Sequence, residues 1–459
     1  NNEIRHRFLD AKTFPAEVIA DLVAYLDIVK EPLSVRSSSL LEDSQYHPFA
    51  GVYDTFMIPN NHPNPFVRLN DLVNTIKLVY ASTFYNNAKD YFKMTSYRLE
   101  EEKMAVVVQR MVGSSHKNRY YPDFSGVAKT YNFYPLPPME SSDGVVSVAL
   151  GLGKTIVEGG LCVRFCPKYP TNLIQFHNPT EALQSNQKSF YALDLETDRY
   201  NESADIIIQD EFTKNYDIHE AEEDGTLGFV GSTYSRDNDA IYAGISRAGS
   251  RLVTFAPILK NKLFPLPEIL ELLLDMGSWR MGTPVEIEFA VNLSVPPYQP
   301  KEFGVLQMRP LVVGQDVDDI RIDNLKDSDL ICKTNDVLGN GVIDDIFDIV
   351  AVDINKFERA KSMQVATEVN HINNKLISEN KSYILFGVGR WGTLDPWLGI
   401  PVNWAQISGA KTIVEAGLKD IPVEPSQGSH FFQNLTSFMI NYFTVGADSS
   451  KSFVDWNFL

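Results

Sequence analysis

The chain has 459 residues and a mass of 51.7 kDa, which leaves room for several domains of about 150 residues each. Hydrophobic residues make up 44% and charged residues 22%, a globular balance that excludes a largely disordered chain. The net charge of −18 argues against a protein that coats nucleic acid or an anionic membrane, although a phosphorylated small molecule can bind where a few cations converge.

The cysteines and the chain start indicate the compartment. Cys162, Cys166 and Cys332 cannot build a disulfide framework, so we expect a cytoplasmic protein. Cys162 and Cys166 form a C-x3-C pair without a second Cys or His pair nearby, so we expect no structural zinc. No apolar run approaches the roughly 18 residues of a membrane span, and we see no signal peptide. The chain opens on Asn1-Asn2, and we expect the natural start to lie upstream.

Hydrophobic periodicity predicts mixed helices and strands in the first part of the chain. Apolar residues at helical spacing predict helices at 15–29, 70–84 and 267–279. Apolar or alternating runs predict strands at 33–37, 104–111, 145–150, 285–291 and 303–307. Further β-like stretches lie between 204 and 256.

Near residue 315 the composition shifts to a short, acidic and turn-rich segment, GQDVDDIRIDNLKDSD, which is typical of a linker. Beyond it the pattern predicts a strand within 343–354, a long helix at 357–380, a strand at 383–387 and a final helix at 430–443. We therefore predict an α+β chain with a first domain over 1–314 and a smaller α/β domain over 320–459.

The clearest chemical pattern lies in the two strands before the linker. Glu286 and Glu288 alternate with apolar neighbours, so they share one face of a strand. Gln307 and Arg309 share a face of the next strand for the same reason. If the strands pair, two carboxylates, an amide oxygen and a guanidinium converge, which suits Mg²⁺ and phosphate. The alternative is a solvated sheet face with an ordinary Glu–Arg pair.

Three other segments carry a weaker signal. Arg36 leaves a predicted strand into three serines, which could cradle phosphate with hydroxyls and free backbone N–H groups or could simply end the strand and cap a helix. The glycines of GLGK, 151–154, allow close approach of a ligand, although this is not a Walker A motif. The strand that contains Gln109 could offer an adenine hydrogen bonds and an apolar slot, or could be core.

Taken together, these segments stand in a familiar order. Arg36-Ser-Ser with Glu42-Asp43, FAGxxDT, VVVQRMV, SGVAKT at 125–130, GLG and ExE…LQMRP follow one another along the chain. This order resembles the N-terminal nucleotide-binding domain of the phosphoenolpyruvate synthase and pyruvate, phosphate dikinase family, over about residues 30–312. The resemblance implies an ATP-grasp fold whose two subdomains bind MgATP between them.

The resemblance also implies roles for single residues. Arg36 would bind ATP phosphates and Arg309 would contact the transferring phosphoryl groups, so these two are the candidate catalytic residues. Glu288, Gln307 and Glu286 would hold Mg²⁺, and Glu286 stands where the family often has an acid. The other positions that match the family's nucleotide site are Thr55 on the phosphate side, Gln109, Met111 and Val112 at the adenine hinge, and Gly151 and Gly153 in the glycine loop.

Two residues depart from the family pattern. Val52 replaces a glutamine, and Lys154 replaces the glutamate of GLGE, where it could add a phosphate contact or mark an altered activity. The family's upstream GGK segment has no counterpart in this chain. We predict a kinase-like phosphotransferase whose acceptor is a phosphoacceptor domain or a small molecule. The alternative is a non-catalytic ATP-binding sensor or regulatory module.

One segment beyond the linker faintly resembles the family's phosphoacceptor motif. Residues 425–430 read PSQGSH and precede an apolar helix. His430 could accept a phosphoryl group, or Ser429 could cap the helix with His430 in a structural role.

Overall fold

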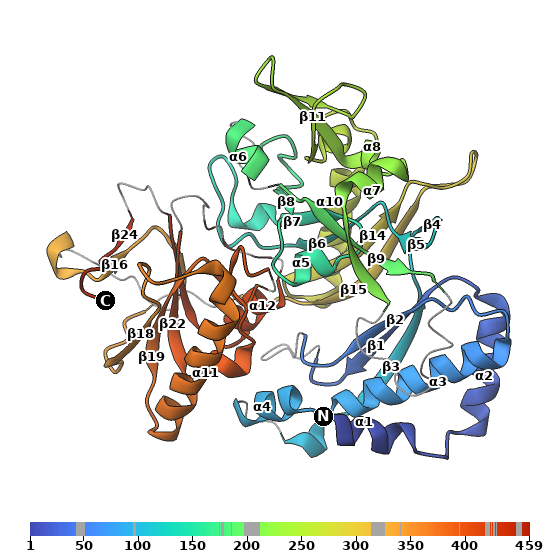
Figure 1. Cartoon of the computed structure of the whole chain (residues 1–459), viewed down its shortest axis with the longest axis horizontal. Coiled ribbons are helices and arrows are strands. Elements are labelled where there is room, and N and C mark those ends of the chain that lie inside the picture. Colours follow the sequence, from blue (N-terminus) through green and yellow to red (C-terminus); the bar gives the residue numbers. More distant parts are fainter. Residues whose placement is uncertain are drawn as a thin grey trace.

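The computed structural model describes residues 1–42, 51–94, 98–173, 175, 179–184, 186–196, 212–313, 326–339, 341–393, 395–417, 423, 425, 427, 429–446 and 452–459. Asp43, the first residues of the FAG motif and most of the predicted linker lie outside these ranges. Helices and strands are mixed throughout the described chain, which confirms the α+β prediction (Figure 1).

The N-terminal part is a small sheet covered by helices. Its strands, in the order β2-β1-β3, are Thr55–Ile58, Leu33–Ser39 and Met104–Arg110. Helices α1 (Asn2–Leu9), α2 (Ala16–Ile28) and α3 (Pro65–Ser82) share an apolar core with this sheet, and α4 (Asn86–Met94) follows (Figure 1). The other face of β1 is turned toward the rest of the molecule.

The central part is built on a five-stranded antiparallel sheet in the order β15-β14-β6-β7-β8. These strands are Glu302–Pro310, Val285–Asn292, Phe124–Lys129, Val145–Leu150 and Val163–Phe165. Helix α10 (Leu266–Met281) contributes Leu270 and Leu274 to the core on one face of this sheet. Short helices accompany it: α5 (Lys154–Val157), α6 (Pro179–Gln184), α7 (Ile218–Glu223), α8 (Leu227–Val230) and α9 (Ala256–Leu259).

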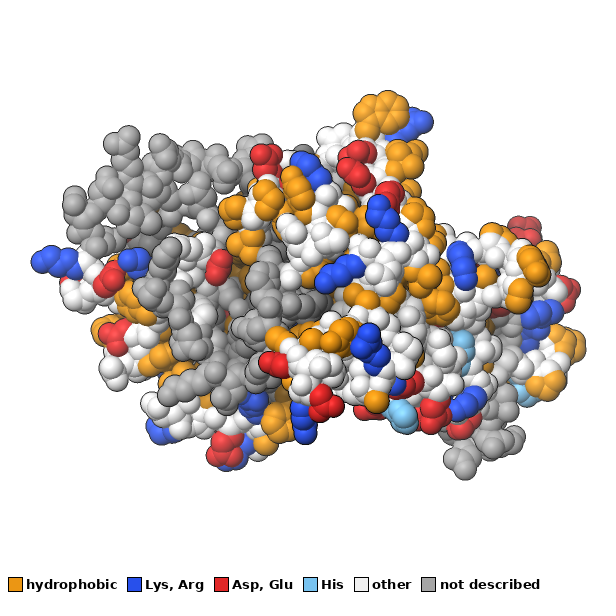
Figure 2. All heavy atoms as spheres, turned by 90° about the horizontal axis from the view of Figure 1, so that it is seen from above, with side chains coloured by type: hydrophobic (Ala, Val, Ile, Leu, Met, Phe, Trp, Pro, Cys, Tyr) orange, Lys and Arg blue, Asp and Glu red, His pale blue; other side chains and the backbone are white. Residues whose placement is uncertain are grey.

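Two smaller sheets complete the central part. One has the order β10-β9-β5-β4, with strands Thr213–Asp217, Ser189–Asp194, Arg119–Tyr121 and Ser114–His116. The other has the order β12-β11-β13, with strands Ala240–Ala243, Gly231–Ser235 and Ser250–Val253. On the face in Figure 2, side chains of both charges are interspersed with hydrophobic ones.

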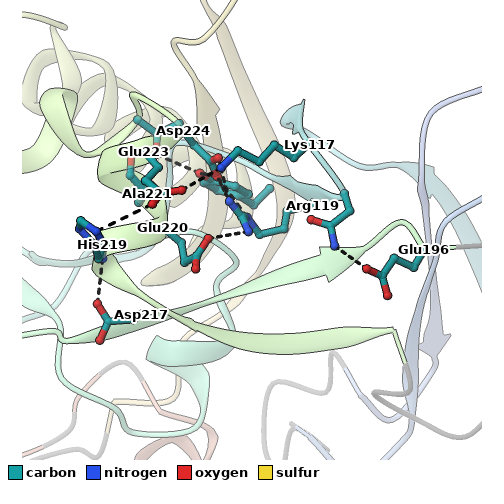
Figure 3. A network of polar contacts seen from close by, with 12 residues as sticks. Lys117, Arg119, Glu196, Asp217, His219, Glu220, Ala221, Glu223 and Asp224 are labelled. Atoms are coloured by element: carbon teal, nitrogen blue, oxygen red, sulfur yellow. Dashed lines mark hydrogen bonds and ion pairs between the residues drawn. The ribbon is translucent and has the colours of Figure 1, made fainter.

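An ion-pair network ties α7 to β5, as Figure 3 shows. Arg119 donates through Nη2 to Asp224 Oδ1 at 2.8 Å and pairs through Nη1 with Glu220 Oε2 at 2.7 Å. Lys117 pairs with Glu223 at 2.8 Å. Because Arg119 and Asp224 are both buried, this network fixes one helix end on the sheet.

The C-terminal part is a second five-stranded sheet in the order β17-β23-β22-β19-β18, parallel except for β17 at its edge. Its strands are Asp336–Leu338, Asn441–Val445, Ala410–Ala416, Tyr383–Val388 and Asp348–Ala351. Helices α11 (Ser362–Ser378) and α12 (His430–Ser437) pack on its core. Two further short strand pairs are β16 (Cys332–Lys333) with β24 (Phe453–Val454), and β20 (Arg390–Trp391) with β21 (Gly399–Ile400).

The end of the last predicted helix is wrong. Helix α12 stops at Ser437, and Asn441–Val445 forms strand β23 instead. Met439 has φ +50, which interrupts the helix, and the aromatic and β-branched residues after it pair with β22. Strand β22 itself was not predicted.

Aromatic and polar contacts join the C-terminal part to the rest. The rings of Phe133 and Phe432 lie 5.4 Å apart, and the backbone N–H of Phe133 donates to Gln427 Oε1 at 3.0 Å. On the other side, Tyr91 of α4 packs on Phe438, with ring centroids 5.1 Å apart. The C-terminal part therefore contacts both the helical layer and the central part. Within the described ranges, no helix has the length and apolar character for a membrane crossing.

Candidate functional site

A pocket of about 360 Å³ lies where β1 and β3 face the β14–β15 hairpin. All the nucleotide-site candidates except Gly151 and Glu286 line it: Arg36, Thr55, Gln109, Met111, Val112, Gly153, Lys154, Glu288, Gln307 and Arg309. Residues almost 300 positions apart in the sequence thus share one cavity. The prediction that the motifs act together is consistent with this placement.

The predicted pairing of the two polar strands is confirmed. In the β14–β15 hairpin, Glu286 lies opposite Arg309 and Glu288 lies opposite Gln307, so all four side chains share one face. The register then shifts between Glu288 and Phe289, which leaves Leu306 as an extra residue in β15. The bulge therefore begins directly beside the two polar pairs.

Glu286 and Arg309 are buried and Glu288 and Gln307 are half-buried, so the alternative of a solvated sheet face is wrong. Arg309 is 3% exposed and donates through Nε to Glu286 Oε1 at 2.9 Å and through Nη2 to Glu288 Oε1. Lys129 Nζ, on β6, lies 2.8 Å from the other oxygen of Glu286. Burial raises the pKa of Glu286, but Lys129 and Arg309 outweigh it and lower that pKa to about 2. Burial lowers the pKa of Arg309, and the carboxylates around it raise it above its usual value.

Arg36 reaches the pocket from the middle of β1. Its Nη2 donates to Gln307 Oε1, which connects the N-terminal sheet to the hairpin. The expectation that the chain leaves the strand after Arg36 is wrong. The serines after it continue β1 and pair with β3, with Ser37 opposite Val106 and Ser39 opposite Met104. The ladder to β2 ends at the pair of Arg36 and Thr55, so beyond Arg36 the strand β1 pairs with β3 alone.

The opposite end of the pocket is more apolar. Met111 and Val112 follow the end of β3 and are both buried. The N–H of Met111 donates to Pro32 O at 2.9 Å, and its carbonyl accepts from Tyr120 Oη at 3.0 Å. Gln109 donates to the Leu306 carbonyl at 3.4 Å. The pocket thus combines an apolar end with a cationic end, which suits a ligand that carries a flat ring and an anionic tail.

The glycine loop lies beside the pocket. Gly151 has φ +81, and a Cβ there would lie 2.7 Å from Tyr191 O, so this glycine allows the loop to approach β9. Gly153 lies at the N-terminus of α5 and lines the pocket. Lys154 also lines it, with Nζ 3.4 Å from Glu158 Oε1 and 5.3 Å from the ring centre of Tyr191.

Two residues that the sequence analysis did not place in the site belong to it. Lys129 holds Glu286; it stands in the SGVAKT segment of the resemblance, where the sequence analysis gave it no role. His430 lines the pocket from α12. A Cβ built on Gly51 would lie 2.6 Å from His430 Nδ1, so the two approach as closely as a glycine permits. Burial first, and Arg309 second, lower the pKa of His430 to about 4.

A metal site in this pocket would need ligands from outside the protein. Among the described residues, no group of three or more His, Cys, Asp or Glu side chains gathers to hold a metal ion. Glu288 and Gln307 nevertheless place a carboxylate and an amide oxygen on the pocket wall. Mg²⁺ commonly uses one or two protein oxygens together with waters and phosphate oxygens, so this donor set fits it.

Comparisons with known proteins agree with the site. The family described as "Pyruvate phosphate dikinase, AMP/ATP-binding domain" matches residues 1–328. The phosphoenolpyruvate synthase of Aeropyrum pernix is 25% identical over 291 residues, 62% of this chain and 29% of that protein. The rifampicin phosphotransferase of Bacillus cereus is 28% identical over 153 residues, 32% of this chain and 15% of that protein. The matches therefore span less than a third of the length of either relative.

Proposed function

Because the chain belongs to the pyruvate phosphate dikinase AMP/ATP-binding domain family, we propose that it binds MgATP in this pocket and transfers a phosphoryl group from it. In this proposal residues 1–314 are an ATP-grasp domain, with the N-terminal sheet and the central part as its two subdomains. Residues 320–459 are a separate α/β domain.

The observation that carries the proposal is the convergence of Arg36 and Arg309 at one end of the pocket. Planar guanidinium groups match phosphate oxygens through paired hydrogen bonds. Both are held before a ligand arrives, Arg36 by Gln307 and Arg309 by two glutamates. Preorganised cations of this kind stabilise the charge that shifts between oxygens during phosphoryl transfer.

We assign Mg²⁺ to Glu288 and Gln307. Glu288 contacts Arg309 through Oε1, which leaves its second oxygen for the ion, and the single amide oxygen of Gln307 would be shared between Arg36 and the ion. Bound there, the ion would neutralise phosphate charge. Glu286 has a different task, since Lys129 and Arg309 occupy both of its oxygens. We assign it to fixing the direction of the Arg309 guanidinium.

We place the adenine against Met111 and Val112, at the apolar end. Gln109 supplies polar atoms there, and the buried side chains exclude water. The phosphates then extend past Thr55, Gly153 and Lys154 toward the arginines. The two relatives are a phosphoenolpyruvate synthase and a rifampicin phosphotransferase, so membership of the family does not identify the acceptor.

Calorimetry with ATP tests this proposal, with and without Mg²⁺. ATP at 100 times its dissociation constant should add about 2.7 kcal/mol to the free energy of unfolding. Glu288→Gln keeps size and hydrogen bonding but removes the charge, so the Mg²⁺-dependent part of the affinity should fall at least tenfold with little change in melting. Glu358→Gln, which removes an exposed Lys361 partner outside the pocket, is the matched control. Equal MgATP affinity in the two variants would contradict the metal assignment, and no ATP binding by the wild-type protein would contradict the function.

A further inference from the structure

Three charged side chains form a row across β6, β14 and β15, which are neighbours in the central sheet (Figure 1). On β14, Glu286 lies opposite Lys129 of β6 on one side and opposite Arg309 of β15 on the other. Lys129 Nζ lies 2.8 Å from Glu286 Oε2, and Arg309 Nε lies 2.9 Å from Glu286 Oε1. All three residues are buried, so each oxygen of this carboxylate already contacts a cation.

The next row on the same face has a different residue on β6. Glu288 lies opposite Gln307 on β15 and opposite Val127 on β6, and Val127 carries no charge. Arg309 contacts Glu288 through Oε1. The side chain of Glu288 is 20% exposed and lines the pocket, whereas that of Glu286 is 3% exposed. The two glutamates of β14 therefore differ mainly in their neighbour on β6.

Packing alone does not explain a lysine at this buried position. Lys129 is 1% exposed, and within the described part of the chain no hydrogen bond supplements its ion pair with Glu286. Its Nζ lies 5.8 Å from the ring centre of Phe432, in the first turn of α12, which the Ser429 hydroxyl caps by accepting from the Phe432 N–H at 3.1 Å. A methionine would fill a similar volume, and apolar side chains often replace a buried ion pair without loss of stability. The charge of the lysine therefore points to its effect on Glu286.

We propose that Lys129 gives the two glutamates of β14 their separate tasks; this rests on the metal assignment of the proposed function. By pairing with Glu286, Lys129 keeps that carboxylate on Arg309 and away from a metal ion. Glu288 is then the carboxylate of the pair that is left for the ion, while the Arg309 guanidinium keeps one direction. Lys129 is a positioning residue, because it acts on the ligand only through Glu286 and Arg309. With one of the two carboxylates withheld, an ion should bind weakly in the absence of nucleotide.

Titration with Mn²⁺ in the absence of nucleotide tests this, with the free ion measured by electron paramagnetic resonance. Mn²⁺ is a suitable probe because it takes the same oxygen ligands as Mg²⁺. Lys129→Met keeps a similar volume but removes the charge, so one oxygen of Glu286 becomes available beside Glu288. Because affinity rises with the number of charged ligands, Lys129→Met should bind Mn²⁺ about tenfold more tightly than the wild type. Lys129→Met/Glu286→Gln lacks the added carboxylate and should return to the wild-type affinity.

Lys301→Met is the matched control. Lys301 Nζ also lies 5.8 Å from a ring centre, that of Phe229, but it donates to the Leu293 carbonyl at 2.6 Å instead of pairing with a carboxylate. This variant should bind Mn²⁺ like the wild type. A gain in Lys301→Met equal to that in Lys129→Met would overturn the inference, because the loss of any lysine would then explain it.

The remaining outcomes separate a positioning role from a structural one. If Lys129→Met melts at a lower temperature and gains no affinity for Mn²⁺, the lysine only stabilises the fold and the inference is overturned. A gain that persists in Lys129→Met/Glu286→Gln overturns it as well, because Glu286 is then not the source. If Lys129→Met does not fold, Lys129→Gln replaces it and must show the same gain. Failure of the proposed function is seen separately, as a wild-type protein that binds no ATP in calorimetry, since the Mn²⁺ titration contains no nucleotide.

Discussion

Replacing Glu286 with glutamine should destabilise the fold, although the change keeps nearly every atom. The side chain is 3% exposed and its oxygens lie 2.8 Å from Lys129 Nζ and 2.9 Å from Arg309 Nε. The substitution leaves two buried cations short of a partner, and breaking a buried pair in this way costs about 3–5 kcal/mol. The lowering of the Glu286 pKa from 4.5 to about 2 corresponds to about 3 kcal/mol at neutral pH, which agrees.

The pH dependence of this stability has a definite sign. The pKa of Glu286 is lower in the folded protein, so the unfolded chain binds more protons between pH 4.5 and about 2. The contribution is therefore complete above pH 4.5 and lost as the pH falls toward 2. Glu286→Gln should remove this part of the acid sensitivity, because the amide does not titrate.

Urea denaturation at neutral pH measures the effect. Glu3→Gln is the matched control, because Glu3 forms an exposed pair with Arg7 and its loss should stay within about 0.5 kcal/mol. Combining Glu286→Gln with Lys129→Met removes one of the stranded cations and should recover part of the loss. A Glu286→Gln protein within 1 kcal/mol of the wild type, with an unchanged denaturant slope, would refute the reasoning.

Three other predictions follow from the described contacts. Gly51→Ala should cost about 1–3 kcal/mol in a melting experiment, because its Cβ would lie 2.6 Å from His430 Nδ1 at φ +66; an equal cost in the His430→Ala background would contradict this cause. Burial raises the pKa of Glu415 to about 7, so the free energy of unfolding should fall by about 3 kcal/mol as the pH rises from 4.5 through 7. Glu415→Gln should flatten that slope, and an identical slope would exclude Glu415 as its source. Limited proteolysis should cut first within 313–330, and the two products should co-elute, because Tyr91 and Phe133 still hold the C-terminal part; initial cleavage elsewhere would argue against the proposed domain boundary.

The sequence predicted the parts of the site that depend on local alternation. Side chains alternate between the two faces of a strand, which is enough to put Glu286 on the same face as Glu288 and Gln307 on the same face as Arg309. Antiparallel pairing then brings the four together. Burial of this group could not be read locally, because it depends on Lys129 from β6 and on the helix that carries His430. The expected end of the strand after Arg36 was wrong for a similar reason, since pairing with β3 continues β1 to Ser39.

The end of α12 shows the same limit in the fold. The apolar spacing continues past Ser437, but Met439 turns the chain and Asn441–Val445 joins a parallel sheet whose other strands are far away in sequence. Tertiary pairing overrides local periodicity in such segments. Strand β22 was missed because Lys411 and Glu415 interrupt its apolar residues and because it follows a stretch rich in glycine, proline and tryptophan.

The extra residue in β15 has a consequence for how this hairpin can vary among relatives. Glu288 lies opposite Gln307 and Phe289 lies opposite Val305, so removing Leu306 would restore regular pairing without exchanging the faces of either strand. Deletion of one residue at Leu306 is therefore tolerable. Deletion of one residue between Gln307 and Arg309 would instead turn Arg309 to the other face of the strand, away from Glu286. Relatives that differ in length here should carry the difference at Leu306, and their pocket would lose the carbonyl that accepts from Gln109.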